Sequence, residues 1–233
     1  KTRGTGQLFK TSLEKSLFSS PAACIKSIEA RLKKLHQKYN TDDIRDICLL
    51  EKLKSALEAI APGKFTRYQK LLELLRSKEY GWNPADTGDR VGLFTERIET
   101  MKYLAERLRQ DLGLKADAIQ EISGGMSDAE QQRIVEEFGR TESPVRVLVA
   151  SDVASEGLNL HYLSHRLIHF DIPWSLMVFQ QRNGRIDRYG QQQRPDIRYM
   201  LIESDNKRIK GDMHIIEILI TKEEQALKNI GVP

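Results

Sequence analysis

Residues 171–191, which read DIPWSLMVFQQRNGRIDRYGQ, organise the rest of the chain. Interpreted as a helix from about Ser175, the stretch has two sides, a polar one with Gln181, Arg185 and Arg188 and an apolar one with Leu176, Phe179 and Ile186. Arginine suits phosphate because its planar guanidinium donates several hydrogen bonds and stays protonated. The stretch therefore predicts a polyphosphate clamp, with an ordinary solvent-exposed charged helix as the alternative. Glycine inside a helix costs about 1 kcal/mol relative to alanine, so Gly184 predicts close packing against the backbone.

The same stretch resembles the last motif of superfamily-two helicases. The resemblance is carried by Asp171-Ile172-Pro173 and by the run from Gln181 to Arg188. It implies that Arg185 and Arg188 act as catalytic fingers of a second RecA-like lobe on ATP, with Gln181 beside the nucleotide. The ending Tyr189-Gly190-Gln191 is similar to the Swi/Snf-type branch, and Ile186-Asp187 resembles its bacterial RNA-polymerase-associated (RapA-like) members.

Composition places the chain among globular proteins with a mild basic excess. It has 233 residues, a net charge of +4 and 30% charged residues, which suits an anionic partner. Cys24 and Cys48 match no metal-binding spacing, so a reducing intracellular compartment is expected. No apolar run reaches the ~18 residues of a membrane span, and residues 1–20 lack a signal-peptide core. Because the chain begins with Lys1, we expect a fragment of a longer protein.

Residues 1–80 predict a helical region. Ser20-Pro21 is a helix start signal. Thr41-Asp42-Asp43 is expected to cap a second helix that carries Ile44 inward. A third helix is predicted from about Thr66 to Arg76. Apolar side chains recur through all three at helical spacing, which is most simply core packing.

The pattern changes after a turn-rich linker at residues 81–89. Five short apolar stretches predict strands, at residues 90–95, 118–122, 145–150, 166–170 and 196–202. Helices are expected between them, one capped by Thr95, one opened by the capping box Ser127-Asp128-Ala129-Glu130, and a closing one with Ile218 on its apolar side. Strands that alternate with helices imply a parallel sheet covered on both faces. Residues 90–233 are thus predicted to form one α/β domain.

Ligands bind such sheets beyond the carboxyl ends of the strands. Residues 150–160 leave the third strand with small, polar and glycine residues, and any strand-to-helix loop has a similar composition. The stretch resembles the fifth motif of superfamily two, which implies that Ser151 touches nucleic-acid phosphate. Thr95 and Gly125, near the ends of two other strands, are further candidate nucleic-acid contacts.

The resemblance also implies a set of nucleotide-binding residues after the third strand. With Gln181, the candidates are Asp152, Glu156, Gly157 and Asn159. Glu156 and Asn159 stand where DEAD-box proteins have arginine and aspartate. This departure favours a Swi/Snf-type translocase over an RNA helicase.

Other stretches predict that this chain lacks a phosphate-binding loop and a metal site. As a phosphate-binding loop, Gly4-Thr5-Gly6-Gln7 lacks the lysine, and Gly63-Lys64-Phe65-Thr66 lacks the upstream glycine and the hydroxyl residue directly after the lysine. No magnesium-binding carboxylate motif is found. ATP and Mg²⁺ are therefore expected to be held by a first lobe outside this chain, which alone is predicted inactive. His161, His165 and His169 lie on a turn and a strand, so no metal site is expected. Trp174 is expected to anchor the arginine stretch, with base stacking as the alternative.

The resemblance and the residue patterns converge on one interpretation. We expect a RecA-like parallel sheet flanked by helices and preceded by a helical region, which acts as the second motor lobe of an ATP-dependent Swi/Snf-type DNA translocase. Expected partners are double-stranded DNA, the first RecA-like lobe and RNA polymerase or another DNA-bound complex, with no membrane, in the bacterial cytoplasm or nucleoid. The alternatives are a non-catalytic nucleic-acid-binding or regulatory module and the lobe of an RNA helicase.

Overall fold

The computed structural model describes residues 2–37, 40, 43–151, 160–162, 164–203 and 211–230. In chain order its elements are α1 (Thr2–Ser19), α2 (Pro21–Gln37), α3 (Ile44–Glu58), the 3-10 turn η2 (Pro62–Lys64), α4 (Thr66–Arg76), β1 (Val91–Thr95), α5 (Ile98–Leu112), the 3-10 turn η3 (Ala116–Ala118), β2 (Ile119–Ile122), α6 (Asp128–Phe138), β3 (Val147–Ser151), β4 (Arg166–His169), α7 (Leu176–Asn183), β5 (Asp196–Tyr199) and α8 (Asp212–Ile230). Within the described ranges, none of these helices combines the length and apolar character needed to cross a bilayer.

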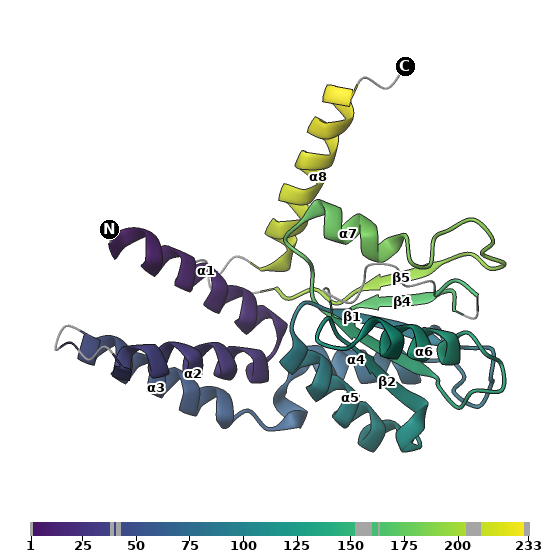
Figure 1. The fold of residues 1–233 in the computed structure, drawn as a ribbon, viewed down its shortest axis with the longest axis horizontal. Coiled ribbons are helices and arrows are strands. Elements are labelled where there is room, and N and C mark those ends of the chain that lie inside the picture. Colours follow the sequence, from purple (N-terminus) through teal and green to yellow (C-terminus); the bar gives the residue numbers. More distant parts are fainter. Residues whose placement is uncertain are drawn as a thin grey trace.

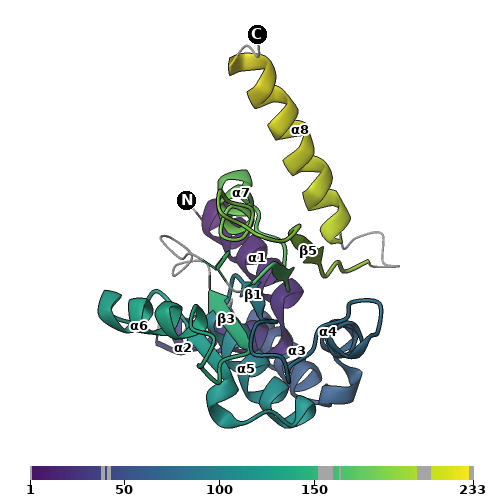
Figure 2. The same cartoon turned by 90° about the vertical axis from the view of Figure 1, so that its right-hand side faces the viewer.

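The five strands form one parallel sheet in the order β2-β3-β1-β4-β5. β1 and β3 are buried along their whole length, which explains their nearly continuous apolar sequences. Helices cover both faces, with α6 and α4 on opposite sides of the sheet in Figure 2. The predicted α/β architecture is therefore confirmed.

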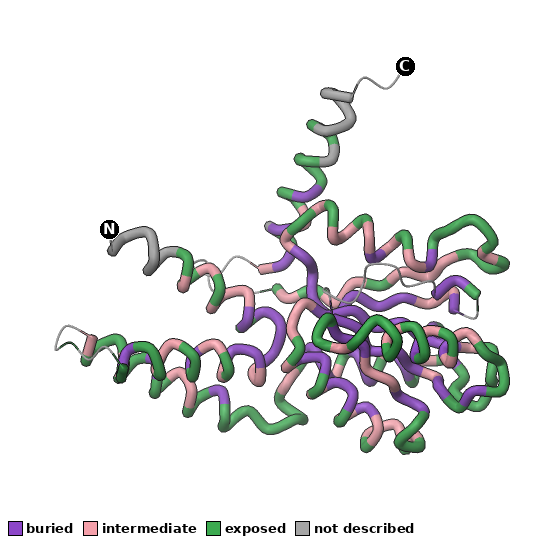
Figure 3. The backbone as a smooth tube through the Cα atoms, in the orientation of Figure 1, coloured by how far each residue is buried: buried purple, intermediate pink, exposed green. Residues whose placement is uncertain are grey.

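Each face of the sheet has its own hydrophobic core. On one face α4 and α5 pack against side chains that include Leu93, Val149 and Ile168. On the other face α6 packs against Phe94, Leu148 and others. Figure 3 shows these strands as the most deeply buried part of the backbone. Alternate residues of one strand thus serve opposite cores, as the period of two requires.

The amino-terminal helices α1, α2 and α3 form an arm that extends away from the sheet (Figure 1). Its own core is formed by Cys24, Ile28, Leu35, Leu50 and Leu57. The hydroxyl group of Ser20 accepts a hydrogen bond from the backbone of Ala23 at 3.1 Å, so the predicted start of α2 is confirmed. Asp43 lies at the N-cap position of α3 but makes no side-chain cap hydrogen bond, and Thr41 and Asp42, the other expected capping residues, lie outside the described residues. Ile44, expected to face inward, is exposed, so that expectation is wrong.

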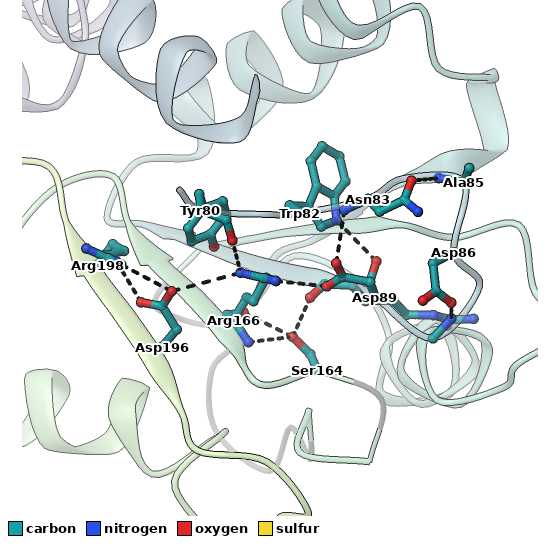
Figure 4. A network of polar contacts seen from close by, with 12 residues as sticks. Tyr80, Trp82, Asn83, Ala85, Asp86, Asp89, Ser164, Arg166, Asp196 and Arg198 are labelled. Atoms are coloured by element: carbon teal, nitrogen blue, oxygen red, sulfur yellow. Dashed lines mark hydrogen bonds and ion pairs between the residues drawn. The ribbon is translucent and has the colours of Figure 1, made fainter. Parts of the chain in front are cut away.

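The predicted linker at residues 81–89 is folded onto the amino-terminal edge of the sheet, as Figure 4 shows. Arg166, at the start of β4, donates to a carboxylate oxygen of Asp89 at 2.8 Å, and its guanidinium lies 4.7 Å from the ring of Tyr80. Trp82 donates to the backbone oxygen of Asp89 at 3.1 Å. Gly81 has a φ of 64°, which only glycine adopts without strain, and it closes the turn before this network.

α4 belongs to the core of the sheet, although the sequence placed it in the preceding helical region. Its inward residues Tyr68, Leu71, Leu72 and Leu75 are all buried there. Its bounds, Thr66–Arg76, match the sequence prediction. The division into residues 1–80, 81–89 and 90–233 stays a prediction.

α8 projects from the body of the molecule in Figures 1 and 2. Its first turns are fixed by a buried ion pair between Asp212 and Arg67 of α4. Ile215 and Leu219 pack with Ile172 and Trp174 in a small cluster, which supports the anchoring interpretation of Trp174. Ile218, expected on the apolar side, is exposed instead.

Candidate functional site

The carboxyl ends of the central strands bring two candidate residues together. Thr95, the last residue of β1, is the register partner of Ser151, the last residue of β3. Both side chains are completely buried. Within the part of the chain that the structure describes, the Ser151 hydroxyl group has no hydrogen-bond partner. A buried hydroxyl group without a partner is costly, so a ligand or another segment is expected to satisfy it.

Thr95 does not cap the following helix, so that prediction is wrong. α5 begins after Arg97, which is the capping residue and makes no side-chain cap hydrogen bond. The Thr95 hydroxyl group instead donates to a carboxylate oxygen of Asp171 at 2.6 Å. A carboxylate oxygen accepts a stronger hydrogen bond than a backbone oxygen does, which favours the bond from Thr95 to Asp171.

The remaining candidates in the strand-end loops fall into two groups. Gly125 lies in the turn after β2, exposed, with open space where a side chain would stand. The nucleotide-binding candidates Asp152, Glu156, Gly157 and Asn159 lie outside the described residues. The Ser127 capping box that follows Gly125 is confirmed, since Ser127 and Glu130 bond to each other's backbone.

The arginine stretch is only partly helical, contrary to the sequence prediction. α7 ends at Asn183, so Arg185 and Arg188 lie in the turns that follow it rather than on one face of a helix. Arg185 is half-buried and Arg188 is exposed. Gln181 lies on α7 and is half-buried.

Gly184 has a different role from the one predicted. It caps the carboxyl end of α7 with a φ of −64°. A Cβ atom there would lie 3.4 Å from the backbone oxygen of Gln180, which is ordinary contact within the same helix. Close packing against another element is therefore not the reason for this glycine.

The arginine that the sequence analysis missed is Arg182, which is completely buried. Its guanidinium donates to the backbone oxygen of Asp171 at 2.9 Å and lies 3.6 Å from a carboxylate oxygen of the same residue. It also lies 5.8 Å from the ring of Phe94. The available signal was the three-residue spacing from the half-buried Phe179, which puts Arg182 on the inward side of α7.

His169 completes this buried cluster as a neutral imidazole. Burial, together with the neighbouring Arg182, lowers the pKa of His169 to about 3. Its Nδ1 atom lies 3.3 Å from Arg182, which can only donate, so Nδ1 accepts. Its Nε2 atom then carries the hydrogen and donates to the side-chain oxygen of Asn183 at 2.8 Å.

The three histidines do not form a metal site. No group of three metal-ligating side chains occurs among the residues that the structure describes. His161 lies in a turn, with its ring tilted against that of Tyr162, while His169 lies in β4 within the core.

Comparison with known families identifies the region that contains these features. Residues 66–190 match the family described as the helicase conserved C-terminal domain. This range includes the three central strands and the arginine stretch.

Among curated proteins, the chain is similar to RNA polymerase-associated proteins named RapA. That of Vibrio campbellii is 30% identical over 144 residues, which are 62% of this chain and 14% of that protein. That of Vibrio vulnificus strain YJ016 is 33% identical over 113 residues, which are 48% of this chain and 11% of that protein. The chain thus spans a small part of the length of these relatives.

Two solved structures share the fold. The C-terminal part of the Fun30 ATPase domain has a TM-score of 0.55 and 18% identity, with 80% of this chain and 57% of that chain covered. The Pyrococcus furiosus Hef helicase domain has a TM-score of 0.52 and 22% identity, with 81% of this chain and 37% of that chain covered. The first is part of an ATPase domain and the second is a helicase domain, in agreement with the expected RecA-like fold.

Proposed function

The chain belongs to the helicase conserved C-terminal domain family, as a RecA-like lobe similar to those of the RapA proteins, and from this premise we propose that it is the second motor lobe of a DNA translocase. In this role it supplies arginine side chains to ATP hydrolysis and part of a nucleic-acid-binding surface. ATP is held between this lobe and a first lobe of the same protein. Hydrolysis drives movement along duplex DNA.

One hydrogen bond carries the proposal, because it joins the two stretches that resemble helicase motifs. The backbone nitrogen of Leu160, at the end of the stretch that follows β3, donates to the backbone oxygen of Arg185 at 3.1 Å. Leu160 therefore lies directly against the arginine turn. We propose that the nucleotide contacts side chains from both of these stretches.

Arg185 and Arg188 are the proposed catalytic residues. Their positions after the helix end leave Arg188 exposed and Arg185 half-buried, which suits side chains that meet a phosphoryl group across an interface. A guanidinium that stabilises charge on a transferring phosphoryl group contributes about 10³- to 10⁵-fold in other nucleotidases. Gln181 is proposed to lie near the nucleotide.

The remaining proposed contacts divide between nucleotide and nucleic acid. The stronger nucleic-acid candidates are the exposed Gly125 and Ser151, whose hydroxyl group has no hydrogen-bond partner among the described residues. Thr95 is the weakest, because its hydroxyl group is committed to Asp171. Asp152, Glu156, Gly157 and Asn159 remain proposed nucleotide contacts on the resemblance alone.

The described residues fit the phosphate groups of ATP but not its magnesium ion. The arginine side chains in the turns after α7 can donate to phosphate oxygens. Among the described residues no cluster of metal-ligating side chains exists, so no step of the reaction is assigned to Mg²⁺ in this chain. The proposed first lobe would hold it.

The proposed partners follow from the chemistry and from the relatives. Duplex DNA suits the basic balance of the chain, a net charge of +4. RNA polymerase is a proposed partner because the RapA relatives are named as associated with it. A bacterial cytoplasmic or nucleoid location fits both partners.

The test is steady-state ATP hydrolysis by the full-length protein with duplex DNA, single-stranded DNA and RNA. Arg185→Ala and Arg188→Ala should each reduce kcat at least about 10²-fold, because each removes a guanidinium that stabilises charge at the phosphoryl group. The KM for ATP should change much less. Arg185→Lys should recover little activity, since an ammonium group lacks the planar fork of donors.

Arg194→Ala is the matched control, because Arg194 is an exposed arginine a few residues beyond Arg188. It should hydrolyse ATP at the parent rate. If Arg185→Ala and Arg188→Ala melt normally and also keep the parent rate, they are not catalytic residues. Stimulation by RNA alone would favour the lobe of an RNA helicase.

A further inference from the structure

The carboxyl group of Asp171 joins three parts of the molecule. One of its oxygens accepts hydrogen bonds from Ser19, at the end of α1, and from Thr95, at the end of β1, each at 2.6 Å. The other oxygen accepts from the backbone nitrogen of Glu96 at 2.7 Å and lies 3.6 Å from Arg182. Asp171 itself is buried. The arm, the sheet and α7 therefore meet at one side chain.

Each hydroxyl group has a single hydrogen, which fixes the donor in every hydrogen bond between the arm and Asp171. Ser19 has one hydroxyl hydrogen, which it donates to Asp171, so Thr100 at 2.7 Å must donate to Ser19. The hydrogen of Thr100 is then used, so Ser20 at 2.6 Å donates to Thr100. The hydroxyl groups of the α1–α2 corner thus form a directed chain that ends on the Asp171 carboxyl group. All these side chains are buried, which makes each bond costly to break.

On the other side of Asp171, the last turn of α7 is held by side chains that leave little freedom. Arg182 bonds to the backbone oxygen of Asp171 and contacts His169. Asn183 accepts from His169 and donates to the hydroxyl group of Tyr199 on β5 at 3.1 Å. The ring of Phe179 stacks on Tyr199, with 5.3 Å between the ring centres. The end of α7 is therefore fixed to β4 and β5.

The turn that carries Arg185 is built directly on this helix end. The backbone nitrogen of Arg185 donates to the oxygen of Arg182 at 3.2 Å, and those of Ile186 and Asp187 donate to the oxygen of Asn183. Ile186 is completely buried in the core of the α6 face. A shift of Arg182 is therefore passed to the backbone of Arg185 through these bonds.

We propose that Arg182 is a positioning residue for Arg185, and that Asp171 couples the α1–α2 corner to the arginine turn. The proposal rests on the proposed function, because it assigns the coupling to the site where Arg185 acts. A shift of the arm relative to the sheet moves Ser19 and Thr100, and their hydrogen bonds then displace the Asp171 carboxyl group. Because this carboxyl group lies against Arg182, the position of the Arg182 side chain changes as well. The arm thus tunes ATP hydrolysis without touching the nucleotide.

The test is a double-mutant cycle in the full-length protein, with kcat and KM for ATP measured at saturating duplex DNA. Ser19→Ala removes the bond from the arm to Asp171. It should lower kcat at least about fivefold and leave KM for ATP within about twofold, because misplacement of a catalytic group acts mainly on the transition state. In the Arg185→Ala background the same change should have less than about a twofold effect, because a residue that acts through Arg185 has nothing left to position.

Ser16→Ala is the matched control, since Ser16 is also a buried serine of α1, but its hydroxyl group donates to Leu13 of its own helix. It should leave kcat unchanged. If Ser19→Ala melts well below the Ser16→Ala protein, the cycle is repeated with Ser19→Cys, which keeps the shape and a weak donor. Ser19→Thr should restore most of the parent kcat, because it keeps a hydroxyl group.

The outcomes separate this proposal from the proposed function. An unchanged kcat in Ser19→Ala, or an equal loss in both backgrounds, overturns the coupling even if Arg185→Ala abolishes hydrolysis. An Arg185→Ala protein with the parent kcat overturns the proposed function, and the coupling with it.

Discussion

The buried imidazole of His169 makes the stability of the protein depend on pH. Its pKa is about 3 in the folded protein, against an ordinary value of 6.5, because burial and the neighbouring Arg182 disfavour the charged form. Since the folded-state pKa is the lower one, the unfolded protein takes up the proton first as the pH falls. Stability is therefore retained above about pH 6.5 and lost progressively from there down to about pH 3.

The size of the effect follows from the two pKa values. Between pH 7 and pH 5 the unfolded imidazole becomes almost fully protonated while the folded one stays neutral, so this group alone lowers the free energy of unfolding by about 2 kcal/mol. His169→Gln removes the titrating group but keeps a polar side chain. That variant should be less stable at both pH values, because it loses the fit to Arg182 and Asn183. Its loss between the two pH values should be about 2 kcal/mol smaller than that of the parent.

The assay is urea unfolding at both pH values, with the midpoint and slope fitted for each protein. His36→Gln is the matched control, because His36 is an exposed imidazole on α2. It should follow the parent at both pH values. If His169→Gln loses as much stability on acidification as the parent does, His169 is not a neutral buried group and the assigned hydrogen-bond directions around it are wrong.

Two further predictions concern the stability of the sheet and the helices around it. Arg166→Ala should lower the free energy of unfolding by about 3 kcal/mol. It leaves the largely buried Asp89 without its ion-pair partner and removes the guanidinium that lies over the ring of Tyr80. The measurement is urea unfolding, with Arg198→Ala as the control. Arg198 is an exposed arginine that also pairs with Asp196, so its loss should lower the free energy of unfolding much less. Equal losses in the two variants would contradict the role of Arg166 in holding residues 81–89 against the sheet. Ser127→Ala should cost about 1 kcal/mol through loss of the capping box on α6. A melting temperature within error of the parent would show that this cap contributes nothing to stability.

Local patterns predicted the elements that rest on local interactions. α4 has the predicted bounds because apolar residues at helical spacing run up to Arg76, and α6 begins where Ser127 and Glu130 satisfy each other's backbone. The strands were found because those buried on both faces have almost no polar residues. Strands alternating with helices then leave few arrangements other than a covered parallel sheet.

The candidate site was predicted in part. Thr95 and Ser151 do lie side by side at the carboxyl ends of β1 and β3, while the binding of a ligand at this edge stays a prediction. The shape of the arginine stretch was not predicted. Periodicity favoured a helix through Arg188, but the chain turns at Gly184, and the buried Ile186 belongs to a core that only the folded sheet provides.

The sequence by itself therefore determined the layered architecture, because periodicity, caps and turns act between neighbouring residues. Only the tertiary structure decided the partners of the buried polar groups. Asp171 receives its hydrogen bond from Ser19 across 152 residues, and no local pattern predicts a pair so far apart. A buried arginine such as Arg182 is tolerated only where the fold supplies a carboxyl group and backbone oxygens, since a guanidinium without partners is too costly to bury.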